Sequence, residues 1–99
     1  MDKRFKPLSP QELLAVRREL TSQLTESPDL PIPIVIRKIR TALRYTIAEY
    51  ATICGVSART LAEIERGNNS PTLATVEKLL KPMGMAPGAV STSASAKRT

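Results

Sequence analysis

Residues 46–67 decide the fold of this chain, and they have the sequence TIAEYATICGVSARTLAEIERG. Two short helices are predicted, because Thr46 and Ser57 each precede an apolar-periodic run and can cap the unpaired N–H groups of a first helical turn. Gly55 supplies the positive φ of a tight turn between them, and Gly67 ends the second helix. The expected inward contacts are Ala48, Ala51, Val56, Leu61 and Ile64. This pattern is a helix-turn-helix, whose second helix is of the kind that enters a DNA major groove.

Further helical patterns flank this motif on both sides. Before it, a helix beginning at Ile34 is expected to place three apolar side chains inward: Ile36, Ile39 and Leu43. After it, a helix over residues 72–83 is expected to bury Leu73, Val76, Leu79, Leu80 and Met83. Pro82 removes one backbone donor near the end of this helix, and Gly84 stops it.

The N-terminal part of the chain carries a separate helix signal. Ser9-Pro10-Gln11-Glu12 combines a hydroxyl cap, a proline at the first helical position and a glutamate that completes a capping box. An amphipathic helix over residues 9–25 is predicted, with the apolar stripe Leu13, Val16, Leu20 and Leu24. Such a helix needs a docking surface, which the same chain, a second copy or another protein could provide.

Four segments follow from these patterns. Residues 1–26 form an N-terminal extension with the amphipathic helix, and residues 27–33 form a proline-rich connector. Residues 34–86 form the helix-turn-helix domain, and residues 87–99 form a polar, low-complexity tail that is expected to be disordered. Since no strand pattern and no internal repeat is present, the predicted fold class is all-α.

Composition narrows the possible functions. The chain has 15 basic and 9 acidic residues, no histidine and a net charge of +6, which suits a polyanion such as DNA but also occurs in many small domains. Its one cysteine, Cys54, excludes an internal disulfide and is interpreted as a small buried hydrophobe rather than a redox sensor. Without histidine, a glycine-rich phosphate loop or a metal-ligand cluster, neither an enzyme nor a cofactor or metal site is expected. No apolar run approaches the roughly 18 residues of a membrane span, so a cytoplasmic protein without membrane partners is expected.

The residues of the motif resemble the Xre-type family, which includes the lambda repressor and Cro. The resemblance runs from about Val35 to Met85 and rests on Ala48-Glu49, Ala51, Gly55-Val56-Ser57, Leu61, Ile64-Glu65-Arg66-Gly67 and Pro71. It implies a lambda-repressor-like helical bundle that binds DNA. In its size, its segment from Thr72 to Met85 and its basic tail, the chain is most similar to antitoxins of HipB type. That narrower resemblance implies repression of its own operon and binding of a HipA-like kinase.

Six side chains are expected on the outer surface of the second motif helix: Ser57, Ala58, Arg59, Ala62, Glu63 and Arg66. Arg59 is the best candidate for base contact, because its guanidinium can donate two bonds to O6 and N7 of a guanine. Ala58 can contact a thymine methyl, and Ser57 can bond a phosphate. Glu63 lies four residues beyond Arg59, so it could orient that guanidinium or accept from a cytosine amine. The alternative is an ordinary solvated pair.

Phosphate contacts, which position such a domain, are predicted at two places. Asn68, Asn69 and Ser70 follow the second motif helix, and Arg44 stands at the entrance to the motif. The alternatives are a polar loop and a solvated charge.

The resemblance also assigns a structural role to one pair of residues, and the chain departs from the family pattern at three positions. It places Arg40 and Glu65 as a partly buried ion pair that ties the first core helix to the recognition helix. Ile47 stands where relatives have a glutamine that bonds a phosphate, so that contact is lost. Arg44 occupies a turn position that is often glycine, and Tyr50 replaces a core leucine.

The sequence therefore predicts a sequence-specific transcriptional repressor that acts as a homodimer on a palindromic double-stranded operator. In the preferred interpretation it is also an antitoxin that binds a HipA-like kinase. Two alternatives remain: a protein-interaction module that binds a toxin with little DNA role, and a stand-alone Xre-type regulator.

Overall fold

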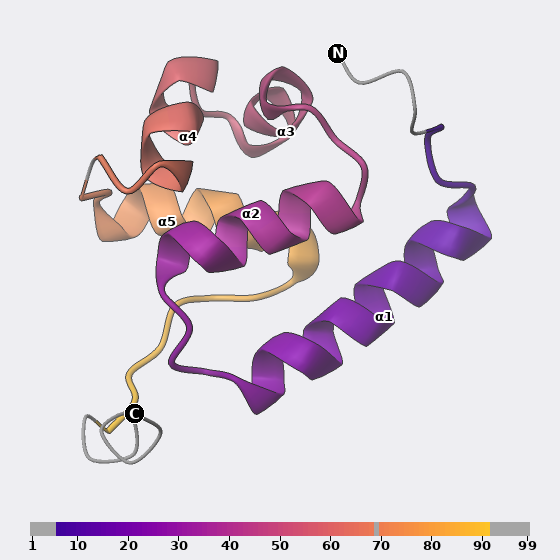
Figure 1. Ribbon diagram of the computed structural model, residues 1–99, viewed down its shortest axis with the longest axis horizontal. Coiled ribbons are helices and arrows are strands. Elements are labelled where there is room, and N and C mark those ends of the chain that lie inside the picture. The colour runs from indigo at the N-terminus through magenta and orange to yellow at the C-terminus, as the bar shows by residue number, and fades with distance from the viewer. Residues whose placement is uncertain (1–5, 69, 92–99) are drawn as a thin grey trace.

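The computed structural model describes residues 6–68 and 70–91, and within them all regular structure is helical, as Figure 1 shows. In chain order the elements are α1 (Pro10–Glu26), α2 (Ile32–Ala42), α3 (Ile47–Cys54), α4 (Ala58–Glu65), α5 (Leu73–Leu80) and the 3-10 helix η1 (Lys81–Met83). The predicted all-α class is therefore confirmed. Of the expected tail, residues 92–99 lie outside the described residues.

Helix α2 crosses the middle of the molecule (Figure 1), with α3 and α4 on one side of it and α1 on the other. It contacts α1, α4 and α5, so the core forms around it. The largest fully buried side chains are Ile36, Ile39, Tyr50, Leu61, Ile64 and Leu79. The predicted inward residues Leu43, Val76, Leu80 and Met83 are buried as well.

Helix α1 begins as its sequence predicts and packs on its own chain. The Ser9 hydroxyl accepts from the Glu12 amide at 3.1 Å, and the Ser9 amide donates to the Glu12 carboxylate at 2.9 Å. The bond from the Ser9 amide, and after it an interaction with the Ser9 hydroxyl, lower the pKa of Glu12, since both favour its charged form. Leu20 and Leu24 are each 5% exposed. Leu13 and Val16 are half-buried against the same core, so most of the apolar stripe that could have served an external partner packs on its own chain.

Helix α2 begins at Ile32, two residues before the expected start at Ile34. Pro31 precedes it, and Pro33 lies in its first turn, where a missing N–H removes no intrahelical bond. The amides of Ile34 and Val35 both donate to the Pro31 carbonyl at 3.0 Å. Of the three prolines that predicted an extended connector, Pro31 and Pro33 therefore form part of the helix start, whereas Pro28 lies in the turn before it.

Two side chains expected in the core are exposed. Ala48 faces solvent because the buried face of α3 is centred on Tyr50 and Cys54, and Ile47 rather than Ala48 packs against the core. Leu73 is 65% exposed, because the first turn of α5 lies at an open groove that no other part of the described chain fills.

Tyr50 fits the core although it replaces a leucine. Its side chain is fully buried, and its hydroxyl donates to the Leu79 carbonyl at 2.6 Å, which satisfies the one polar atom that leucine lacks. Burial raises the pKa of this phenol and of the neighbouring Cys54 thiol. Cys54 is 8% exposed, in keeping with its interpretation as a small hydrophobe.

Four helix ends share one turn geometry, with a left-handed residue after the last helical turn: Arg44, Gly55, Gly67 and Gly84. At the end of α2, the Arg44 amide donates to the Thr41 carbonyl and the Tyr45 amide to the Arg40 carbonyl, both at 3.1 Å. This is the Schellman arrangement, which satisfies the last carbonyls of a helix. Arg44 is the one member of the four that carries a side chain, at φ 63°.

We therefore predict that Arg44→Gly is more stable than Arg44→Ala. Both variants lose the guanidinium, but only glycine relieves the steric cost of the left-handed conformation, so the free energies of unfolding should differ by about 1 kcal/mol. Urea unfolding of the two variants measures the difference. The control is Thr41, an exposed position within α2, where alanine should be the more stable replacement by about 1 kcal/mol. The same order at both positions would show that Arg44 carries no conformational strain.

Candidate nucleic-acid interface

The two motif helices are fixed at their starts by side-chain caps. The Thr46 hydroxyl accepts from the Glu49 amide at 3.1 Å, while the Glu49 carboxylate accepts from the Thr46 amide at 2.8 Å. The Ser57 hydroxyl accepts from the Thr60 amide at 3.0 Å. Gly55, at φ 78°, turns the chain from α3 into α4. Each helix is only eight residues long, so these caps and tertiary packing supply the stability that length does not.

Helix α4 has one buried face and one outward face. Leu61 and Ile64 are fully buried. Of the six residues predicted for the outer surface, Ser57, Ala58, Arg59 and Arg66 are exposed, and Ala62 and Glu63 are half-buried. Three of the six are small, so a DNA groove can approach the helix backbone closely.

Arg59 projects into solvent from this face. Its side chain is 87% exposed, and its Nε lies 3.5 Å from Oε2 of Glu63, whose side chain is 31% exposed. At this distance and exposure the pair contributes a few tenths of a kcal/mol at most. The Arg59 guanidinium can therefore bind a base edge and lose little from leaving Glu63.

Arg40 and Glu65 fix the orientation of α4 from its buried side. Arg40 Nε donates to one Glu65 carboxylate oxygen at 2.7 Å, and Nη2 donates to the other at 2.9 Å. Arg40 Nη1 donates to the Tyr45 carbonyl at 3.0 Å. The side chains of Arg40 and Glu65 are 13% and 5% exposed, so α2, the turn after it and the end of α4 are joined by one partly buried group of bonds.

The predicted phosphate contacts separate into two places. Asn68 and Ser70 are exposed after the end of α4, whereas Asn69 lies outside the described residues. The backbone N–H of Asn68 donates to the Glu63 carbonyl at 3.0 Å, so only the side chain of Asn68 remains to donate to a phosphate. Arg44 lies at the other end of the motif, before α3, where its Nη1 donates to the Lys6 carbonyl at 3.1 Å.

Sequence reasoning missed two features of this surface. The Thr46–Glu49 capping box has a local signal, a threonine followed three residues later by glutamate. The contact between Arg44 and Lys6 has none, because it joins a side chain to a distant backbone carbonyl.

Neither a metal centre nor a membrane span is found in the part of the chain that the structure describes. Its histidine, cysteine, aspartate and glutamate residues form no group of three or more that could hold a metal ion. None of its helices is both long and apolar enough to cross a membrane.

Comparison with known proteins agrees with this geometry. A helix-turn-helix family model matches residues 36–89, which is more than half of the chain. The chain belongs to the helix-turn-helix family, whose members are sequence-specific DNA-binding regulators and not normally enzymes. No curated protein and no solved structure matches the chain.

We predict strong coupling between Arg40 and Glu65 in a double-mutant cycle. Arg40→Met or Glu65→Gln should each lower the free energy of unfolding by about 2–4 kcal/mol, because each leaves its partner partly buried and unpaired. The double variant should lose less free energy of unfolding than the two single variants together, with a coupling energy of at least about 1 kcal/mol. Denaturant unfolding measures all four species.

The matched control for this cycle is Arg59 and Glu63, a pair of the same charges on the exposed face of α4. Its coupling should stay below about 0.5 kcal/mol. Equal coupling in the two cycles would mean that the partly buried pair does not fix α4.

Proposed function

We propose that the protein is a sequence-specific transcriptional repressor that binds a palindromic operator as a homodimer. One observation carries this proposal: α4 presents Arg59 between small side chains on an exposed face, while Arg40 and Glu65 hold the helix from its buried side. A short rigid helix with a forked donor among small residues suits direct readout in a major groove.

In this proposal each residue of the α4 face has a distinct task. Arg59 donates to O6 and N7 of a guanine, and Ala58 contacts a neighbouring thymine methyl. Ser57 and Arg66 stand at the two ends of the helix, where phosphates flank the groove. Asn68 and Ser70 add polar contacts beyond the end of α4. Glu63 orients Arg59 or accepts from a cytosine amine.

Two-fold symmetry and charge complete the mechanism. Two copies of α4 would enter successive major grooves about 34 Å apart, so the operator consists of two inverted half-sites. The net charge of +6 attracts DNA before the bases are read, and this attraction weakens as salt increases. Repression follows because the bound dimer occupies promoter DNA.

The operator can be found by selecting duplexes from a random-sequence pool with the full-length protein. On the selected site, Arg59→Ala should weaken binding by about 1–3 kcal/mol and relax the preference at one base position in each half-site. The control is Arg18→Ala, which removes the same charge from the exposed side of α1, on the far side of α2 in Figure 1. If the Arg59 variant retains its base preference, Arg59 does not read the operator.

A second candidate function, that of an antitoxin bound to a HipA-like kinase, is favoured by an apolar groove of about 360 Å³. The groove is lined by the end of α1, the segment that follows it, the start of α2, α5 and the segment after η1. None of these supplies a residue of the outer surface of α4. Leu73 and Val90, at its rim, are 65% and 44% exposed. DNA recognition by α4 leaves this surface available to a protein partner.

We predict that Leu73→Glu separates partner binding from DNA binding. When the protein is co-expressed with the product of the adjoining reading frame, the wild type should co-purify with it. The Leu73→Glu variant should lose at least tenfold in affinity, because a charge in an apolar contact must be desolvated. The exposed position of Leu73 predicts unchanged unfolding and DNA binding. Absence of any kinase partner would leave a stand-alone regulator.

A further inference from the structure

One hydrogen bond connects the N-terminal extension to the turn between α2 and α3. Arg44 Nη1 donates to the Lys6 carbonyl at 3.1 Å, across 38 positions of sequence. Both residues are exposed, so two cationic side chains are brought to one place at the surface. The N-terminal segment is therefore not a solvated leader at this point but an addition to the turn between α2 and α3.

The backbone at Arg44 is held in an unfavourable conformation. Its φ is 63°, whereas the other described residues with φ in this range are Gly55, Gly67 and Gly84. Glycine would form the same turn without the side-chain clash, so the fold alone does not require an arginine here. A strained residue with an exposed charged side chain is a candidate for function.

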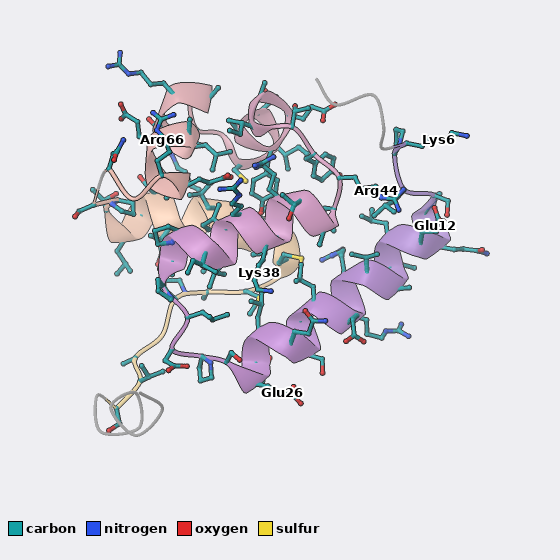
Figure 2. All side chains as sticks on the ribbon, viewed as in Figure 1. Lys6, Glu12, Glu26, Lys38, Arg44 and Arg66 are labelled. Atoms are coloured by element: carbon teal, nitrogen blue, oxygen red, sulfur yellow. The ribbon has the colours of Figure 1, made fainter. Side chains whose placement is uncertain are left out.

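The pair lies close to the N-terminal end of α3. Arg44 lies two residues before Thr46, which caps α3. Figure 2 shows Arg44 and Lys6 near each other on one side of α3, whereas Arg66 lies at α4 on its other side. The side chain of Ile47, the first residue of α3, has no donor for a phosphate, whereas the exposed Arg44 guanidinium nearby has several.

Glu12 is an acid within electrostatic reach of Arg44. The Glu12 carboxylate accepts a bond from the Ser9 amide at 2.9 Å in the α1 capping box. The charge of Arg44 is the smallest of the causes that lower the pKa of Glu12. Both Arg44 and Lys6 are exposed, so their side chains are accessible from solvent.

We propose that Lys6 and Arg44 form a phosphate-binding pair that contacts the DNA backbone outside the base pairs read by α4. This inference rests on the proposed DNA-binding function and extends its footprint beyond the helix-turn-helix unit. Arg44 positions Lys6 through the carbonyl bond and keeps its remaining donors for the phosphate. The pair adds affinity and salt dependence without adding base preference, because phosphates carry no sequence information.

The test compares Lys6→Gln with Lys38→Gln on the selected operator. Both variants remove one exposed lysine charge, but Figure 2 shows Lys38 on the side of α2 away from α3 and α4. On a duplex extended by several base pairs at each end, Lys6→Gln should lower affinity about fivefold to tenfold at about 0.1 M salt. The slope of log K against log salt should fall by about one for each bound chain, with base preference unchanged. Lys38→Gln should behave as the wild type.

A duplex that ends at the last base pair read by α4 lacks the flanking phosphates. On it, Lys6→Gln and the wild type should bind equally. Arg44→Gly should lose at least as much affinity on the long duplex as Lys6→Gln, because both the cation and the anchor are removed. Its unfolding measured alongside separates this loss from a folding defect.

The outcomes distinguish this inference from the proposed function. If the wild type selects an operator but Lys6→Gln matches Lys38→Gln on the long duplex, the phosphate pair is wrong and the repressor function stands. If Lys6→Gln loses the same affinity on the long and the short duplex, Lys6 does not contact the flanking DNA. If the wild type selects no sequence, the proposed function and this inference are both wrong.

Discussion

The three hydrogen bonds donated by the Arg40 guanidinium are the constraint on which the exposed face of α4 depends. Two of them hold the Glu65 carboxylate, and the third holds the Tyr45 carbonyl. Since Glu65 is drawn inward, rotation of α4 about its own axis is fixed, and Arg59 is left on the exposed side. Among the described residues no buried side-chain nitrogen or oxygen lacks a hydrogen-bond partner, so this partly buried charge pair is fully compensated.

Short helices make the fold depend on how each helix begins and ends. Helices α3, α4 and α5 have eight residues each, too few for independent stability. Hydroxyl caps begin all three, and left-handed turns follow α2, α3 and α4. At one of those turns the left-handed residue is Arg44 instead of glycine. Local strain and the attachment of the N-terminal segment therefore occur at the same residue, beside α3.

The sequence predicted what local patterns determine and missed what depends on distant contacts. Helix starts at Ser9, Thr46 and Ser57 were predicted because a hydroxyl cap is a local signal. The exposure of Leu73 was not predicted, because the apolar period of a helix shows which face is apolar but not how far neighbouring elements cover that face. The docking of α1 on its own chain was likewise open, since a leucine stripe does not identify its partner. The base-facing side of α4 followed from the burial of Leu61 and Ile64, while the Arg44–Lys6 bond had no sequence pattern.

Amide chemical-shift mapping on a selected operator duplex tests most directly whether α4 is the DNA-reading element. We expect the largest changes over Ser57 to Arg66, with further changes at Thr46 and Arg44, and little change at Leu20 and Leu24 in the α1 contact. The reverse pattern, with α4 unperturbed and the largest changes around Leu73 and Val90 in the apolar groove, would contradict recognition of DNA by α4.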